Sequence, residues 1–117
     1  MKEMLDKTKY PDKPIDIQDR DFDETINKYP LMLVDFWADW CPPCRIVGPV
    51  IEELARELQG RVVFGKLDVG SNQATALKFG ITAIPTLLIF KEGKMVEGIK
   101  GAVPKEKILG KLMNYIQ

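Results

Sequence analysis

The chain has two cysteines, Cys41 and Cys44, in the stretch Trp40-Cys41-Pro42-Pro43-Cys44. Two thiols at this spacing can close into a small disulfide ring and reopen, which is the chemistry of thiol–disulfide exchange. The attacking form is the thiolate, and a free cysteine thiol has a pKa of about 8.5. The pair stands where an apolar run gives way to a helical pattern, and the start of a helix favours an anion. We therefore expect Cys41 to attack and Cys44, one turn further in and more buried, to resolve the mixed disulfide.

The composition excludes most other chemistry. The chain has no histidine, the usual general base and the commonest metal ligand. A cysteine-only zinc site needs four thiolates, so a metal would have to bridge two chains or recruit carboxylates. We therefore expect no metal and no bound cofactor, because the electrons reside in the sulfurs. Lys plus Arg and Asp plus Glu are balanced at 17 each, so we expect no nucleic-acid or membrane-surface partner.

The start of the chain differs from the rest. Residues 1–13 show neither helical nor strand periodicity, and we expect a flexible N-terminal extension before one domain at 14–117. Lys and Asp are scattered through residues 1–14 without an apolar block, which predicts neither a signal peptide nor an anchor. We therefore expect a cytoplasmic monomer, and in that compartment Cys-x-x-Cys is a redox or metal motif rather than a structural disulfide.

The hydrophobic pattern predicts an α/β fold with the element order β-α-β-α-β-α-β-β-α. Apolar runs at 31–37 and 61–69 are typical of strands buried on both faces of a sheet. Strands that alternate with helices imply parallel pairing, whereas the turn at 91–94 joins 86–90 to 95–99 in an antiparallel hairpin. The sequence predicts four helices. The first carries Phe22 and Ile26 on one face, and the second runs from the cysteines to Gly60. The third runs from Ser71 or Asn72 to Phe79, and the last runs from Pro104 to Ile116.

Asp35 interrupts the buried run at 31–37. A carboxylate in the middle of an apolar strand is costly when charged, so we expect its pKa to be raised. The alternative is an aspartate at the end of the strand that reaches solvent.

Three stretches of the chain resemble thioredoxins: Val34–Cys44, Gly80–Thr86 and Gly101-Ala102. The resemblance covers residues 14–117 and implies the thioredoxin fold. In that fold a central mixed sheet of strand order 1-3-2-4-5 is flanked by four helices in three layers. It also implies a protein-disulfide reductase that acts on disulfide-containing proteins by reversible oxidation of the dithiol. A separate thioredoxin reductase would supply the electrons.

The resemblance further implies roles for single residues. Asp35 matches the buried acid that assists proton transfer at the resolving cysteine, Cys44. Lys66 matches the lysine that pairs with this acid, although a surface lysine is an alternative. Pro85 matches a cis-proline that lies against the disulfide. The matching substrate groove comprises Trp40, Pro42, Pro43, Ala83, Ile84, Pro85, Gly101 and Ala102.

The chain departs from the usual thioredoxin pattern at two positions. Thioredoxins usually carry Gly-Pro between the cysteines, whereas Pro42 here removes an N–H and stiffens the loop, so we expect a more oxidising couple. Lys100 stands where an apolar residue is common. Two other functions stay open at this point: a net oxidant or isomerase, and a binding module that uses the same groove without turnover. A glutaredoxin fits less well, because Trp40-Cys41 and Asp35 suit thioredoxins better.

Overall fold

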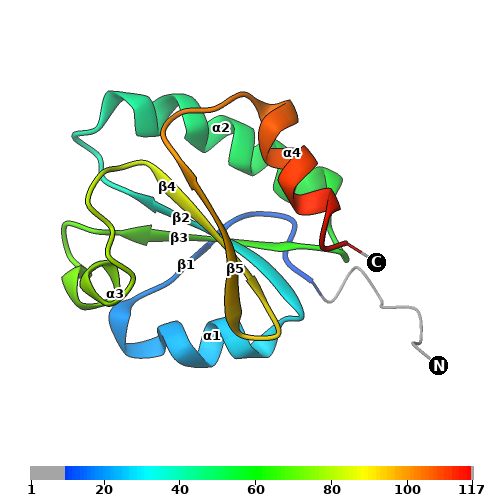
Figure 1. Ribbon diagram of the computed structural model, residues 1–117, viewed down its shortest axis with the longest axis horizontal. Coiled ribbons are helices and arrows are strands. Elements are labelled where there is room, and N and C mark those ends of the chain that lie inside the picture. The colour runs from blue at the N-terminus through cyan, green and yellow to red at the C-terminus, as the bar shows by residue number, and fades with distance from the viewer. Residues whose placement is uncertain (1–9, 117) are drawn as a thin grey trace.

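In the computed structural model, which describes residues 10–116, five strands form one mixed sheet and four α-helices cover its two faces (Figure 1). The strands are β1 (Ile15–Asp16), β2 (Leu31–Trp37), β3 (Val63–Asp68), β4 (Thr86–Lys91) and β5 (Lys94–Lys100). The helices are α1 (Phe22–Lys28), α2 (Pro42–Glu57), α3 (Gln73–Lys78) and α4 (Lys105–Met113), and a short 3₁₀ turn (Asp19–Asp21) precedes α1. The strand order is β1-β3-β2-β4-β5, which confirms the predicted fold.

Strand β2 lies at the centre of the sheet because both of its faces are apolar. It pairs in parallel with β3 and antiparallel with β4. The β4–β5 hairpin is antiparallel, as its turn sequence predicts. In this register Asp35 of β2 lies between Lys66 of β3 and Leu87 of β4. The acid is therefore held at the middle of the sheet, away from its edges.

Two hydrophobic cores lie on opposite faces of the sheet, because side chains alternate along each strand. Helices α2 and α4 cover one core, and α1 and α3 cover the other (Figure 1). The first core includes Leu33, Val47, Ile51, Leu54, Phe64, Leu87, Ile108 and Leu112. The second includes Phe22, Ile26, Met32, Val34, Phe36, Leu67 and Phe90. No helix within residues 10–116 is both long enough and apolar enough to span a membrane.

The ends of the chain differ from expectation in detail. The last helix ends at Met113 rather than Ile116, although Ile116 still packs against the first core. Residues 1–9, most of the expected flexible extension, lie outside the described residues. Within the remainder, the Tyr10 ring lies 5.5 Å from that of Tyr29, and the Tyr10 carbonyl accepts a 2.8 Å hydrogen bond from Gln59. The domain start at residue 14 stays a prediction.

The cap of α3 comes from a distant residue. Asn72 occupies the N-cap position, but its amide donates to the Asp68 carbonyl and its side-chain oxygen accepts from the Asp19 N–H. The Asp19 carboxylate takes over the capping role, since it accepts from the N–H groups of Ala74 (3.2 Å) and Thr75 (2.9 Å). It also accepts from the Thr75 hydroxyl at 2.6 Å. Asp19 thus connects the 3₁₀ turn to α3.

Replacing Asp19 with alanine should destabilise the protein by about 1–2 kcal/mol at pH 7, because the helix loses its cap. Burial raises the pKa of Asp19, but the hydrogen bonds from Thr75 and Ala74 outweigh it, and the net pKa is lowered. The stabilisation is therefore present above the unfolded pKa and is lost as the pH falls through the folded pKa. Urea unfolding of the wild type and of Asp19→Ala at pH 7 and at pH 2.5 measures the difference in their free energies of unfolding at each pH.

The control for this experiment is Asp23→Ala. Asp23 is an exposed acid that forms a 3.3 Å ion pair with Lys78. Exposed pairs of this kind contribute little, so the control should change the stability by less than about 0.5 kcal/mol. Equal losses in the two variants at pH 7 would contradict the capping role of Asp19.

Candidate active site

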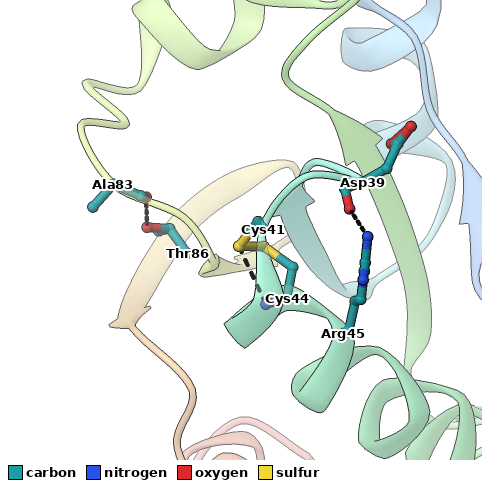
Figure 2. The surroundings of a disulfide bond; sticks show 6 residues. All are labelled: Asp39, Cys41, Cys44, Arg45, Ala83 and Thr86. Carbon is teal, nitrogen blue, oxygen red and sulfur yellow. Dashed lines mark hydrogen bonds between the residues drawn. A yellow bond between two sulfur atoms is a disulfide. The ribbon is translucent and has the colours of Figure 1, made fainter.

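The two cysteines form a disulfide at the N-terminus of α2 (Figure 2). Cys41 is the N-cap residue with an extended backbone, and the two prolines occupy the first helical positions. Proline suits these positions because a backbone N–H there would have no partner within the helix. The Cα atoms of Cys41 and Cys44 are 5.3 Å apart. The predicted placement of the pair at a strand-to-helix junction is therefore confirmed.

A single backbone N–H distinguishes the two sulfurs. The Cys44 N–H donates a hydrogen bond to the Cys41 sulfur, drawn as a dashed line in Figure 2. The Cys44 nitrogen is 3.2 Å from this sulfur and 3.1 Å from the Cys41 carbonyl oxygen. Because Pro42 and Pro43 carry no N–H, Cys44 supplies the first backbone donor of α2. A donor at this position and the helix dipole both favour a negative charge on the Cys41 sulfur. Cys41 is therefore the candidate for the thiolate once the disulfide is reduced.

Burial does not distinguish the cysteines. Each is 4% exposed, so the expectation that Cys44 is more buried is wrong for this disulfide form. The small ring holds both residues in the same environment at the end of the helix. The asymmetry between them comes from hydrogen bonding instead.

The segment Ala83–Thr86 lies beside the disulfide (Figure 2). The Ile84–Pro85 peptide bond is cis, the geometry that the resemblance implies. The Thr86 hydroxyl donates a 2.7 Å hydrogen bond to the Ala83 carbonyl, and the Gly101 N–H donates one of 2.8 Å to the Pro85 carbonyl. These bonds hold the segment to the ends of β4 and β5.

Trp40 forms one wall of a shallow hollow next to the cysteines, and its side chain is 71% exposed. The other lining residues are Val69, Ala76, Ile81, Thr82, Ala83 and Ile84. Of the expected groove residues, the structure therefore brings Trp40, Ala83 and Ile84 together. The other five expected residues do not line this hollow: exposed Pro42, Pro43 and Ala102, half-buried Gly101 and buried Pro85.

Four residues of the hollow were not predicted from the sequence: Val69, Ala76, Ile81 and Thr82. Val69 directly follows β3, and Ala76 lies on α3. An apolar residue just beyond the carboxyl end of a parallel strand was the one signal that could have indicated Val69, since ligand sites gather there.

Asp35 is buried beneath α2, 1% exposed, on the same face of the sheet as its strand neighbour Leu33. Neither of its carboxylate oxygens has a hydrogen-bond partner among the described residues. Burial raises the pKa of Asp35 to about 7, and the nearby charge of Lys66 opposes that rise. A carboxyl group with this pKa can both accept and release a proton near neutral pH.

Comparisons with known proteins agree with this geometry. The family model described as thioredoxin matches residues 13–114. The chain belongs to the thioredoxin family. It is 50% identical over 93 residues to thioredoxin 2 of Chlorobaculum tepidum, covering 80% of this chain and 85% of that protein. It is 46% identical over 94 residues to a thioredoxin of Staphylococcus haemolyticus, and this match covers 80% of this chain and 89% of that protein.

A solved structure, that of a mutant thioredoxin from Halobacterium salinarum, matches with a TM-score of 0.86 and 33% identity. The match covers 92% of this chain and 95% of that one. Together with the Cys41–Cys44 pair, these matches identify the protein as a thiol–disulfide oxidoreductase of the protein-disulfide reductase type. They do not favour the alternative of a binding module without turnover.

Lys66 does not pair with the buried acid in the way that the thioredoxin resemblance implies. The two residues are opposite each other in the β2–β3 register, yet no ion pair within 4 Å joins them in the described structure. The Lys66 ammonium lies 4.2 Å from the centre of the Trp37 ring instead, a cation–π distance. Lys66 therefore acts on Asp35 through its field, without a direct bond.

Proposed function

We propose that Cys41 is the nucleophile and Cys44 the resolving cysteine in the reduction of disulfides of other proteins. The hydrogen bond from the Cys44 N–H to the Cys41 sulfur carries this assignment. It favours the thiolate on Cys41 and leaves Cys44 as the thiol that must still lose a proton.

The proposed reaction proceeds in two exchanges. The Cys41 thiolate attacks one sulfur of the substrate disulfide, forms a mixed disulfide and releases the other substrate sulfur as a thiolate that takes up a proton. Cys44 then loses its proton and attacks the Cys41 sulfur, which releases the second substrate thiol and closes the Cys41–Cys44 disulfide. Two electrons and two protons pass from the dithiol to the substrate.

We assign Asp35 to the proton transfer at Cys44. Its side chain lies on the sheet face that α2 covers, and its pKa of about 7 lies below that of an ordinary cysteine thiol. At neutral pH the carboxylate form can accept the Cys44 proton and later return it. Lys66 serves as a positioning residue whose charge keeps the pKa of Asp35 from rising further.

The substrate is proposed to lie as an extended segment across Trp40, Ala83 and Ile84, with Pro42, Pro43, Pro85 and Ala102 at its sides. Apolar surface of this kind favours backbone and side-chain contact without demanding one sequence. Gly101 has φ +85°, and a Cβ there would meet nothing within 4 Å. The space beside Gly101 is thus open to a partner backbone.

The oxidised form needs an electron donor, for which we propose a separate thioredoxin reductase, with the protein working as a monomer in the cytoplasm. Within residues 10–116 no group of three or more acidic, cysteine or histidine side chains is arranged to hold a metal. The exchange steps above need no bound cofactor, since each electron pair moves between sulfurs.

Reduction of insulin with dithiothreitol as the electron source tests this function. The protein should accelerate the reaction, and the Cys41→Ser variant should not. Replacing dithiothreitol with NADPH- or ferredoxin-linked reductases then identifies the donor. The equilibrium potential of the Cys41–Cys44 couple separates a reductase from an oxidant, and it also measures the effect of Pro42. No acceleration by the wild-type chain would contradict the proposal.

A further inference from the structure

Lys100, the last residue of β5, places an exposed positive charge beside the segment that faces the disulfide. It lies directly opposite Thr86 in the β4–β5 register. Directly opposite residues of an antiparallel pair point to the same face, so the Lys100 side chain emerges on the same side as that of Thr86. Thr86 in turn bonds to Ala83, which lines the hollow next to Trp40.

The charge of Lys100 has no ion-pair partner within the described structure, in contrast to those of Lys105 and Lys111. Lys105 is paired with Glu53 at 3.1 Å and Glu57 at 2.8 Å. Lys111 is paired with Glu97 at 3.2 Å. No ion pair involves Lys100. Its field is therefore available to a molecule that docks there.

Another cation, Arg45 of α2, lies on the other side of the disulfide (Figure 2). Its guanidinium donates a 2.7 Å hydrogen bond to the backbone carbonyl oxygen of Asp39, and no ion pair within the described structure joins it to the Asp39 carboxylate. On the β5 side of the site, the exposed charge is that of Lys100. The residue after Lys100, Gly101, borders open space, so a partner backbone can approach this charge.

We propose that Lys100 makes the enzyme prefer substrates with an acidic residue next to the disulfide that is reduced. This inference rests on the proposed function, because it assumes that the substrate lies along Ala83 and Ile84. An exposed pair is screened by salt and weak in absolute terms, so Lys100 tunes the choice of substrate without preventing turnover of neutral ones.

The test compares three disulfide peptides that differ in one flanking residue: Glu, Gln or Lys. At low salt the wild type should show a kcat/KM for the Glu peptide roughly three- to tenfold above that for the Lys peptide. Lys100→Gln should remove this ratio, and Lys100→Glu should invert it. Because each ratio is taken within one variant, a loss of folded protein cancels. Raising the salt to about 0.5 M should bring the wild-type ratio towards one.

The matched control is Lys94→Glu, which makes the same charge change at the opposite end of β5. Lys94 is exposed and forms no ion pair within the described structure. This variant should keep the wild-type ratio. Equal kcat/KM values for the three peptides, or inversion by Lys94→Glu as well, would overturn the inference and leave the proposed function intact. No turnover of any peptide by the wild type would overturn both.

Discussion

The Cys44→Ser variant should accumulate covalent mixed disulfides with its substrates, whereas Cys41→Ser should accumulate almost none. Removing the resolving thiol leaves the first exchange possible and blocks the second, so the substrate stays bound through Cys41. Steady-state reduction should fall by at least about a thousandfold in both variants, because neither can close the ring. Gel electrophoresis without reductant, followed by mass spectrometry of the adduct, measures the trapped fraction.

The double variant Cys41→Ser/Cys44→Ser is the control for trapping by non-covalent contact. The structure makes the result informative because both cysteines have the same exposed fraction, 4%. The burial of the two residues in the disulfide form therefore gives no reason to expect a difference between them. If Cys41→Ser traps as much substrate as Cys44→Ser, the hydrogen bond from the Cys44 N–H does not select the nucleophile, and our assignment of roles is wrong.

Replacing Asp35 with asparagine should stabilise the protein at neutral and alkaline pH and slow its catalysis. In the unfolded chain the Asp35 carboxyl ionises near its usual pKa of 3.8, whereas burial holds the folded pKa at about 7. The unfolded state thus binds fewer protons between these values, and wild-type stability falls as the pH rises from about 4 to 7. The gap of about three pKa units corresponds to a loss on the order of 4 kcal/mol.

The stability gain of Asp35→Asn should therefore be smallest near pH 4, grow up to about pH 7 and then level off. The buried amide keeps unpaired polar atoms, so the gain will be smaller than the full titration cost. Urea unfolding from pH 4 to pH 9 measures it. Asp16→Asn is the control, because Asp16 is an exposed acid that faces Lys66 from β1. A flat difference between wild type and Asp35→Asn across this range would contradict a raised pKa.

Asp35→Asn should lower the rate of catalysis, although it raises the stability of the fold. We expect release of product from the mixed disulfide to slow about tenfold or more at pH 7.5. This is less than the usual general-base effect of about a hundredfold or more, because a cysteine thiol already ionises partly near this pH. Below about pH 6 the wild-type carboxyl is protonated, and the two rates should converge. Stopped-flow measurement of the Trp40 and Trp37 fluorescence during single turnover follows this step.

Much of the fold could be predicted from the sequence because its signals are local. The run 31–37 is apolar at successive positions, which predicts a strand inside the sheet with Asp35 buried in it, and the structure confirms both. The apolar run before the cysteines, the helical pattern after them and the two prolines between them predict that the pair stands at the start of a helix. The thioredoxin strand order, in contrast, came from the resemblance and not from these patterns.

Other features depend on residues that meet only in the tertiary structure. Asp19 caps α3 although it precedes Thr75 by 56 positions, and no local pattern could name that partner. Val69 and Ala76 join the hollow at Trp40 for the same reason. Lys66 could be assigned to the strand next to Asp35, but its place over the Trp37 ring follows from the sheet register and side-chain packing. Periodicity along the chain determines which face of an element is buried, whereas the partner of each side chain is decided only when separate elements pack together.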